Sequence, residues 1–586
     1  MRCGVDTGGT FTDVVTDDGR VVKVLSTPDD PGRAVRSGLG DVHPDLLAHG
    51  TTVATNALLE RRGATVALVT TAGFADVIEI GRQDRPSLYD IWADRPEPLV
   101  PRHLRLEVDG RLDASGREIE PVGSVPPVPE GVDAVAVCLL HADLNPAHEQ
   151  AVATRLSGSG LDLSCSHDVS PEFREYERTV TTVVNAYLRP RCRGYLAGLD
   201  GLAGEVLVMT SAGGLVPAAD AAALPVALLL SGPAGGVVAG AAAASAAGFG
   251  GAITFDMGGT STDVCLIQGG VPAPAPQRRA AGLPIRLPSL DIHTIGAGGG
   301  SIARVDPGGA LVVGPESAGA VPGPACYGRG GTEPTVTDAD LVLGRIPPDA
   351  VFPELGALDR DAAEAALARA GATAEGVVAV VDAAMERALR VVSVERGVDP
   401  SALALVAFGG AGPLHACALA EALGMAAVVV PPRAGVLSAV GLLCAPRQRD
   451  LVRSWPTPGD HDGVEAARRE LGERAAALVG DGAEVITSID CRYAGQSHEL
   501  TVATVGDFAG EHERRNGYAR PGAPVEVVAL RAAARAPVAL RPEDLGPVDR
   551  KPVTGPCVVA EPDCTIWIPD GWSAEVAVDG SYVITP

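Results

Sequence analysis

The sequence predicts an α/β fold of two similar halves followed by a β-rich unit. The first observation is a repeated motif: Asp-x-Gly-Gly-Thr-x-Thr-Asp-Val spans residues 6–14 and recurs at 256–264. Both copies follow an apolar, strand-like run, so each copy is expected to open one half. The second observation is length, because 586 residues are too many for one hydrophobic core, and roughly two to four domains are expected.

Each copy of the motif predicts a β-hairpin whose turn binds phosphate. The glycine pair supplies the φ freedom of a tight turn and lets backbone N–H groups approach an anion. The hydroxyl residues add donors, and Asp6 and Asp256 are placed to hold a hydrated divalent cation. Such a hairpin binds phosphate without a lysine. The alternative is an ordinary turn with capping hydroxyls, and the repetition of the motif argues against it. Two facing hairpins would hold a polyphosphate between the halves.

Composition excludes several classes of function. A net charge of −26 argues against nucleic-acid binding, which needs a basic surface. Lys23 and Lys551 are the only lysines, so no P-loop is present and a Schiff-base lysine is not expected. The cysteines form no Cys-x-x-Cys pair and no signal peptide is visible, which favours a reducing cytoplasm. The apolar stretch 221–247 is broken by prolines and glycines, so it predicts buried helices and not a membrane span.

The first third of the chain alternates strand and helix patterns after the first hairpin. A returning strand is predicted at 20–25, and a helix starts near Thr55 or Asn56, where free N–H groups bind anions. His49 is either a site residue or a hydrogen-bonded interior histidine. The proline-studded stretch 81–101 predicts a long ordered loop at a cleft edge. Further predictions are buried strands at 65–70 and 132–140, helices at 145–156 and 170–188, a strand at 205–209, and an alanine-rich helix from 231.

The second hairpin is followed by further candidate site residues. Asp291 and His293 share one face of an extended segment, where they could ligate a metal or transfer protons, although two residues alone favour a structural hydrogen-bonded pair. Asp338 is either a site acid or a helix N-cap. Residues 403–416 predict a strand, a Gly-Gly-x-Gly turn and a helix, over which a base and ribose can pass. Residues 459–586 predict a mostly β unit.

Seven segments together resemble the hydantoinase A/oxoprolinase family, and the resemblance covers essentially the whole chain. The segments are Asp6–Asp13, His49–Leu59, Asp256–Val264, Asp291–Ala303, Phe408–Ala416, Arg492–Leu500 and Gly555–Asp563. The resemblance implies two ribonuclease-H-like, actin-like halves with ATP and Mg²⁺ (or Mn²⁺) between them. It divides the chain into an N-terminal half at 1–185, a central half at 186–458 and the β-rich unit at 459–586.

The resemblance also implies roles for individual residues. ATP would be bound by Thr7, Gly8, Gly9, Thr10 and Thr12 of the first hairpin, by Gly258, Gly259, Thr260 and Ser261 of the second, and by Gly409, Gly410 and Gly412 of the adenosine turn. Catalytic and metal-binding roles fall to Asp6, Asp256, Asp291 and His293, the last two beside the acceptor with a second divalent ion. A separate B-type subunit is implied as partner in a cytoplasmic hetero-oligomer.

Three functions are compatible with these motifs. The first is an ATP-dependent cyclic amidohydrolase subunit of the hydantoinase or 5-oxoprolinase type, which activates a ring amide by phosphorylating its carbonyl oxygen. The second is the β subunit of an ATP-dependent ketone carboxylase, with an enolate or bicarbonate as acceptor. The third, ranked lower, is an ATP-driven chaperone-like or reactivating factor. The sequence does not identify the substrate.

Overall fold

The computed structural model describes residues 1–9, 11–27, 30–347, 351–352 and 356–586. The first half of the chain forms a mixed sheet with the strand order β12-β11-β4-β1-β2-β3. Its elements are β1 (Arg2–Thr7), β2 (Phe11–Thr16), β3 (Val21–Leu25), β4 (Leu46–Thr51), β11 (Glu205–Met209), β12 (Leu215–Pro217), α1 (Pro31–Leu39) and α2 (Val53–Leu59). Strand β1 pairs antiparallel with β2 and parallel with β4, and β4 pairs parallel with β11.

The second half repeats this connectivity in a larger sheet with the order β15-β14-β13-β25-β26-β35-β34-β31, and β20 joins β14. Its strands are β13 (Gly251–Met257), β14 (Thr262–Gln268), β15 (Val271–Pro272), β20 (Ile292–Ile295), β25 (Ala404–Phe408), β26 (Ala427–Val430), β31 (Val553–Thr554), β34 (Ser573–Val576) and β35 (Tyr582–Thr585). Strand β13 pairs antiparallel with β14 and parallel with β25, as β1 does with β2 and β4. The predicted α/β class with two ribonuclease-H-like halves is therefore confirmed.

Helices and small hairpins surround the second sheet. The helices are α8 (Gly232–Ala246), α9 (Val336–Val342), α10 (Arg360–Ala370), α11 (Ala374–Val392), α12 (Gly412–Leu423) and α13 (Leu437–Cys444). The remaining strands here are β16 (Pro274–Ala275), β19 (Ser289–Leu290), β21 (Ser301–Val305), β22 (Leu311–Ser317), β23 (Val351–Phe352), β24 (Gly356–Ala357), β32 (Cys557–Ala560) and β33 (Thr565–Ile568). The hairpin of β17 (Arg278–Ala280) and β18 (Leu283–Ile285) packs instead against α6 (Glu175–Ala197).

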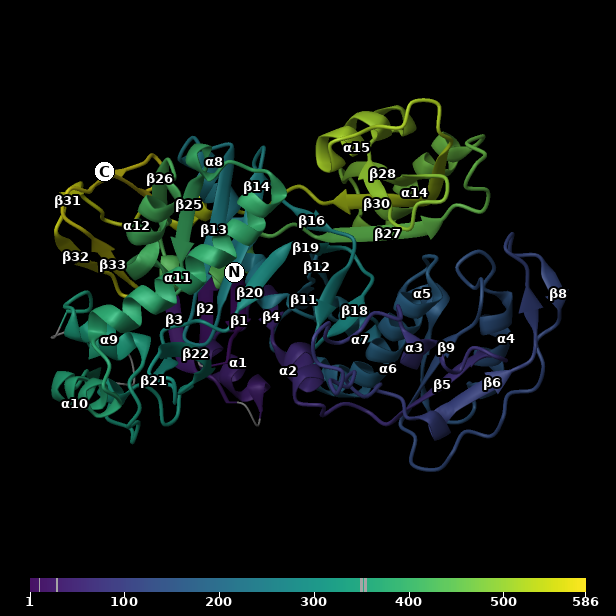
Figure 1. Cartoon of the computed structure of the whole chain (residues 1–586), viewed down its shortest axis with the longest axis horizontal. Coiled ribbons are helices and arrows are strands. Elements are labelled where there is room, and N and C mark those ends of the chain that lie inside the picture. The colour runs from purple at the N-terminus through teal and green to yellow at the C-terminus, as the bar shows by residue number, and fades with distance from the viewer. Residues whose placement is uncertain (10, 28–29, 348–350, 353–355) are drawn as a thin grey trace.

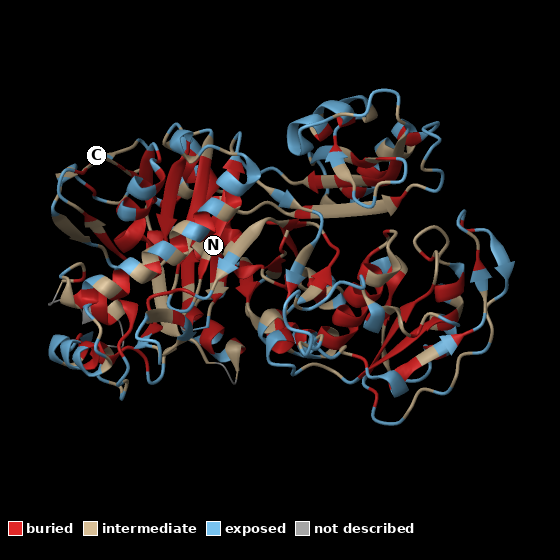
Figure 2. Ribbon diagram, in the orientation of Figure 1, coloured by how far each residue is buried: buried red, intermediate tan, exposed pale blue. Residues whose placement is uncertain are grey.

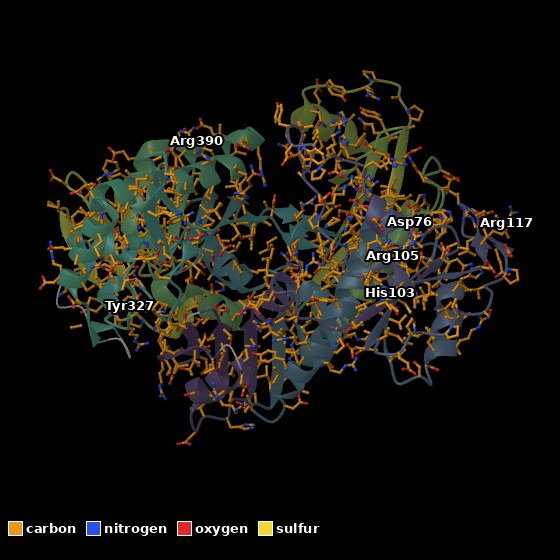
Figure 3. All side chains as sticks on the ribbon, turned by 60° about the horizontal axis from the view of Figure 1, so that its bottom comes forward. Asp76, His103, Arg105, Arg117, Tyr327 and Arg390 are labelled. Carbon is orange, nitrogen blue, oxygen red and sulfur yellow. The ribbon has the colours of Figure 1, made fainter. Side chains whose placement is uncertain are left out.

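Two further units lie on the other side of the molecule (Figure 1). The inserted unit has a parallel sheet of order β10-β9-β5-β6. Its elements are β5 (Val66–Thr71), β6 (Arg105–Val108), β7 (Arg111–Leu112), β8 (Glu118–Glu120), β9 (Ala134–Cys138), β10 (Asp162–Cys165), α3 (Val77–Ile80), α4 (Ala147–Leu156), α5 (Ser166–Val169), α6 (Glu175–Ala197) and α7 (Ala218–Ala223). Figure 3 places Asp76, His103 and Arg105 together in this unit, far from Tyr327 of the second half.

The carboxy-terminal unit is an antiparallel sheet of order β27-β30-β28-β29 with two helices. Its elements are β27 (Gln448–Ser454), β28 (Glu484–Tyr493), β29 (Leu500–Val502), β30 (Val525–Arg535), α14 (Val464–Val479) and α15 (Phe508–Asn516). Figure 2 shows the central strands of the second half buried along their length, whereas β27 is mostly half-buried. Among the described residues, no helix is long and apolar enough to cross a membrane.

The boundaries expected at 185/186 and 458/459 differ from those of the sheets. The first sheet is completed by β11 and β12, and the carboxy-terminal unit already begins with β27. The last strand of the chain, β35, returns to the second half, where it pairs antiparallel with β26. Strand pairing between distant segments decides these boundaries, and a linear division of the sequence does not contain that information.

A close helix crossing joins the two halves. Helix α13 packs on β1 and β4 of the first sheet, and α8 packs on β13 and β25 of the second. A Cβ atom on Gly441 of α13 would lie only 1.8 Å from the carbonyl oxygen of Gly235 in α8. On the other side, a Cβ on Gly236 would lie 2.5 Å from the ring of Phe408 in β25. Glycine is required here because only a missing side chain allows backbones this close.

The carboxy-terminal unit is attached to the inserted unit by buried ion pairs. Glu172, just before α6, accepts from Arg286 at 3.0 Å and from Arg531 of β30 at 2.7 Å. Arg531 also contacts Asp490 of β28 at 2.7 Å, and Arg286 contacts Glu499 at 2.7 Å. Each charge therefore has an opposite partner from another segment, which is what allows burial of such groups. Glu499 belongs to the Arg492–Leu500 segment that carries part of the family resemblance.

The helix crossing can be tested by Gly441→Ala. The added methyl group has no room against Gly235, so the variant should be destabilised by about 1–3 kcal/mol, the usual cost of overpacking. The urea midpoint of unfolding measures this. Gly194→Ala is the matched control, since Gly194 is an exposed helical glycine with open space around it. Equal midpoints for both variants would contradict the proposed constraint.

Candidate functional site

The two hairpins carry their aspartates at equivalent positions. Asp6 lies opposite Asp13 in the β1–β2 register, and Asp256 lies opposite Asp263 in the β13–β14 register. The first aspartate of each pair is confined by a glycine of the next parallel segment. A Cβ on Gly50 of β4 would lie 2.7 Å from Asp6 Oδ1. One on Gly409, after β25, would lie 2.4 Å from Asp256 Oδ1, so both carboxylates are held against bare backbone.

Burial raises the pKa of all four carboxyl groups, and neighbouring carboxylates add to the rise for Asp6 and Asp256. Burial, and then Asp13, raise the pKa of Asp6 to about 7, and burial raises that of Asp263 to about 6. Burial raises the pKa of Asp256 well above its ordinary value, with further contributions from Asp263, Asp6 and Asp13. Asp256 is thus close enough to both hairpins to be affected by each. Such a cluster favours a bound cation, which would return the carboxylates to their ionised form.

An unpartnered oxygen supports this interpretation. Asp6 Oδ1 is buried and accepts no hydrogen bond from the described residues. Buried carboxylate oxygens are normally satisfied, so one without a donor indicates a missing ligand. Carboxylates are also the ligands that Mg²⁺ and Mn²⁺ prefer. The donor set of Asp6 and Asp256 therefore fits a hydrated divalent ion.

The turns of the hairpins are closed by hydrogen bonds and leave their tips open. The N–H of Gly8 donates to the Phe11 carbonyl at 3.0 Å, and that of Gly258 donates to the Ser261 carbonyl at 3.1 Å. These two N–H groups are committed to the turn, so they are not free to donate to a phosphate. Gly9, Gly259 and Thr260 are exposed, and Thr10 lies outside the described residues. Thr7 and Thr12, by contrast, are buried beneath the turn.

Neither motif contains a lysine, but Lys23 of β3 lies beside the first hairpin. It lies opposite Asp13 in the β2–β3 register, and its Nζ is 2.6 Å from Asp13 Oδ1. The equivalent residue of the second hairpin, Asp263, instead accepts from the hydroxyl of Thr294 in β20. The two hairpins are therefore alike in backbone but differ in charge. The sequence indicated this contact only through the position of Lys23 on the predicted returning strand. Pairing of that strand with the hairpin then brings Lys23 beside Asp13.

Two glycine-rich segments support the second hairpin. The N–H groups of Gly299 and Gly300 donate to the carbonyls of Gly258 and Gly259, at 3.0 and 2.7 Å. The predicted adenosine turn is joined to the same hairpin, because the Ala411 N–H donates to the Met257 carbonyl at 3.0 Å. Within that turn, Gly410 has open space where a side chain would project, and Gly412 begins α12. The turn thus presents uncovered backbone beside Asp256.

Sequence reasoning missed Ser438 and Asp563. The hydroxyl of Ser438, on α13, donates to Asp256 and partly offsets its raised pKa. Asp563 accepts from the Gly435 N–H at 2.8 Å. Ala434, the residue before Gly435, accepts from the Gly409 N–H at 2.9 Å through its carbonyl oxygen. The carboxy-terminal segment therefore supports the adenosine turn through one intermediate loop. Ser438 lies outside all seven motif segments, and Asp563 ends the Gly555–Asp563 segment, whose sequence gave no reason to place it near the Gly409–Gly412 turn.

Asp291 and His293 lie apart from the aspartates of the hairpins. Cross-strand neighbours share a face, so Thr294 lies with Asp263, while His293, opposite Val264, lies on the other face. Asp291 forms an ion pair with Arg396, just after α11. Their predicted role beside the acceptor stays a prediction. Metal binding by Asp291 would require it to leave Arg396.

Other candidate residues have structural roles. His49 is fully buried between the Val5 carbonyl (3.1 Å) and the Tyr195 hydroxyl (2.7 Å), and burial lowers its pKa to about 4. Asp338 accepts from the N–H groups of Cys326 and Thr335, both at 2.8 Å, and forms a capping box at the start of α9. In both cases the structural alternative is the one observed.

His415 anchors the helix that follows the adenosine turn. Its Nδ1 lies 2.7 Å from Asp382 of α11, and its Nε2 lies 3.2 Å from Asp340 of α9. Burial lowers the pKa of His415, but the two carboxylates, Asp340 first, outweigh it and raise the pKa to about 10. The imidazolium therefore joins three helices next to the Gly409–Gly412 turn.

The contribution of His415 to stability should depend on pH. Its folded pKa is raised above its ordinary value near 6.5, so the contribution is full below about pH 6.5 and is lost as pH rises through about 10. His415→Gln leaves two carboxylates uncompensated and should cost about 3–5 kcal/mol near neutral pH. Urea midpoints at pH 7 and pH 10.5 should show a large gap to the wild type that narrows at the higher pH. A gap independent of pH would refute the imidazolium, and His43→Gln, an exposed site, is the control.

Comparisons with known proteins agree with this geometry. The family model of the hydantoinase/oxoprolinase N-terminal region matches residues 2–160, and the hydantoinase/oxoprolinase model matches residues 178–450. The caprolactamase subunit alpha of Pseudomonas jessenii is 34% identical, over 100% of this chain and 99% of that protein. A crystal structure titled as the ATP-dependent caprolactamase from the same organism superposes with a TM-score of 0.83 at 32% identity, covering 100% of both chains.

Two other relatives match a smaller share of this chain. The 5-oxoprolinase 1 of Arabidopsis thaliana is 36% identical over 75% of this chain, which spans only 41% of that protein. The acetophenone carboxylase gamma subunit of Aromatoleum aromaticum is 34% identical over 75% of this chain and 67% of its own length. The family models, the end-to-end match to a caprolactamase subunit and the shared fold show that this chain belongs to the hydantoinase/oxoprolinase family.

Proposed function

We propose that the chain is the nucleotide-binding subunit of an ATP-dependent cyclic amidohydrolase. The observation that carries the proposal is the pair of aspartate–glycine hairpins, because carboxylates of both hairpins contribute to the raised pKa of Asp256. Phosphate groups and a divalent ion are the ligands that such a cluster accommodates. The caprolactamase that this chain matches from end to end is described as ATP-dependent, which supports the same chemistry here.

Different residues of the chain bind the metal ion, the phosphates and the nucleoside. Asp6 and Asp256 hold the divalent ion and its waters, and Ser438 keeps Asp256 oriented. The exposed tips hold the phosphates through backbone N–H groups and hydroxyls, and Lys23 offsets one of the four negative charges. Gly409, Gly410 and Gly412 leave the backbone bare for the adenosine. When bound, the divalent ion supplies charge neutralisation for the transferring phosphoryl group.

Activation of the acceptor follows from amide chemistry. A ring amide resists attack because its nitrogen donates electrons into the carbonyl group. Transfer of the γ-phosphoryl group from ATP to the carbonyl oxygen releases ADP, and loss of the N–H proton leaves an imidoyl phosphate. Its carbon is electrophilic because the phosphate is a good leaving group. The protein contributes positioning and electrostatic stabilisation, since the rigid hairpins hold both reactants with little reorganisation.

An ATP-dependent carboxylase subunit is the second candidate. It is favoured by the 34% identity to an acetophenone carboxylase gamma subunit, which matches 75% of this chain, the same share as the 5-oxoprolinase matches. The nucleotide chemistry would be the same, and the acceptor would be an enolate or bicarbonate. The acceptor that stimulates ADP release separates the two functions.

The first prediction concerns ADP release with different acceptors. The purified chain, with Mg²⁺ or Mn²⁺ and a co-expressed B-type subunit, should release ADP faster with caprolactam, 5-oxoproline or a hydantoin than without acceptor. Asp256→Asn should reduce that rate by at least about 100-fold, because it removes a metal-binding carboxylate. Asp570→Asn, at an exposed turn, should leave the rate unchanged. Stimulation only by a ketone with bicarbonate would move the assignment to the carboxylases, and lack of ATP binding would refute both.

The B-type partner is proposed to dock on the loop that precedes the 3-10 helix η1 (Arg102–Leu104). Leu88, Tyr89, Ile91 and Trp92 are 76%, 97%, 81% and 84% exposed, an unusual concentration of large apolar side chains on one loop. Aromatic residues of this kind dominate binding energy at protein interfaces. The end-to-end relative is itself named as one subunit of a caprolactamase, which supports a second subunit as the occupant.

The docking loop can be tested by the double variant Tyr89→Ala, Trp92→Ala. Because both side chains are exposed, the thermal midpoint of the isolated chain should not change. Affinity for the B-type subunit, measured by calorimetry, should fall by about 30-fold or more. Ile119→Ala, exposed on β8, is the control for a general loss of apolar surface. Unchanged affinity in the double variant would exclude this loop from the interface.

A further inference from the structure

Several buried polar atoms outside the carboxylate cluster also lack a partner. Among the described residues, Ser211 Oγ, Ser231 Oγ and Arg278 Nε are enclosed without a hydrogen bond. Unsatisfied buried groups are rare in folded proteins and indicate a ligand or water when they occur together. All three are connected to one short segment, the 3-10 helix η2 (Pro225–Leu228) and the turn that leads from it into α8.

Arg278 is the charged member of this group. It lies in β17 opposite Ile285 of β18, and its Nη2 donates to the Val226 carbonyl at 3.3 Å. No carboxylate of the described chain forms an ion pair with it, and burial alone lowers its pKa to about 9. Arg286, just after β18, has two carboxylate partners, Glu172 and Glu499. The chain carries 73 acidic against 47 basic residues, so an enclosed arginine without an acid partner is not explained by a shortage of acids.

A continuous set of contacts connects Arg278 to the first hairpin. The Ser211 N–H donates to the carbonyl of Ala227, the residue after the one that Arg278 contacts, at 2.9 Å. Further along, the Leu230 N–H donates to Thr55 Oγ1 of α2 at 3.0 Å. One turn earlier, Thr52 Oγ1 donates to the carbonyl of Thr7, beside Asp6, at 3.3 Å. Segment 226–231 therefore spans the distance between Arg278 and the phosphate-binding end of β1.

We infer that Arg278 binds a carboxylate or carbonate oxyanion of the acceptor, with the hydroxyls of Ser211 and Ser231 as neutral donors. The inference rests on the proposed function, and it specifies the acceptor as anionic. The free Nε–H and the second hydrogen of Nη2 form the edge with which arginine binds a carboxylate through two parallel hydrogen bonds. β17 is held by its pairing with β18 and by the bond to Val226, so this edge is fixed before the ligand arrives.

Two acceptors carry this chemistry. A ring amide with a carboxylate substituent, such as 5-oxoproline, would present its carboxylate to Arg278 and its ring amide to the hairpins. Bicarbonate, the acceptor of the carboxylase alternative, would present two of its oxygens. The competing explanation is structural: Arg278 would serve only to attach the β17–β18 hairpin to Val226.

Binding measurements separate these cases. Calorimetry with Mg²⁺ and a non-hydrolysable ATP analogue would compare 5-oxoproline, its neutral counterpart 2-pyrrolidone, and bicarbonate. Arg278→Met should weaken binding of the acidic ligand by about 10- to 100-fold, as expected for charged hydrogen bonds, and leave 2-pyrrolidone within about twofold. Arg278→Lys should recover part of the loss, because it keeps the charge but not the paired donors. Arg279→Met is the matched control, since the neighbouring Arg279 is exposed and donates to the Gly282 carbonyl.

Each outcome decides the inference independently of the proposed function. A selective loss for 5-oxoproline supports the inference with a ring-amide carboxylate as ligand, and a selective loss for bicarbonate supports it with carbonate. An equal loss for 2-pyrrolidone, or unchanged binding with a lowered thermal midpoint, would assign Arg278 to structure alone. Wild-type chain that binds neither anion would also overturn the inference. ADP release is measured separately, so stimulation by a neutral lactam without anion binding would retain the proposed function and reject only the anion site.

Discussion

The approach of α8 to α13 is the constraint on which the rest of the architecture depends. Helix α8 packs on the second sheet and helix α13 packs on the first. The two helices meet at Gly235 and Gly441, where their backbones are in direct contact. Because helix α13 also packs on β1 and β4, this crossing fixes the distance between the two sheets. Asp6 and Asp13 of the first hairpin are consequently close enough to raise the pKa of Asp256 in the second. A wider crossing would separate the carboxylates and remove the electrostatic reason for a cation to bind.

The two hairpins are similar in backbone but not in their surroundings. Asp13 is neutralised by Lys23, while Asp263 accepts a hydroxyl from Thr294. The second hairpin is also supported by the Gly299–Gly300 segment and by the turn after β25. The two hairpins therefore differ in the residues around their turns, where the ligand is expected to bind. A nucleotide is itself asymmetric, because it has phosphates at one end and a base at the other. The nucleoside role falls to the second half because the bare Gly409–Gly412 turn lies there.

Buried charges connect units that the chain order separates. Glu172, Arg286 and Arg531 link the inserted unit to the carboxy-terminal unit, and His415 links three helices behind the adenosine turn. All of these groups have opposite partners. Asp6 and Arg278 each have a buried side-chain atom without a hydrogen-bond partner. Open groups of opposite charge at these two positions are consistent with ligands of opposite sign.

Local sequence determined the hairpins, most strand and helix positions, and the aspartates and glycines of the candidate site, because turn chemistry and hydrophobic periodicity act within a few residues. The family resemblance added the two-half architecture, which the strand orders confirm. Only the tertiary structure decided the unit boundaries, the pairing of β35 with β26, and the positions of Lys23, Ser438, Asp563 and Arg278. It also placed His293 on the face away from Asp263 and bound Asp291 to Arg396. These features depend on which distant segments pack together, and spacing along one chain does not specify that.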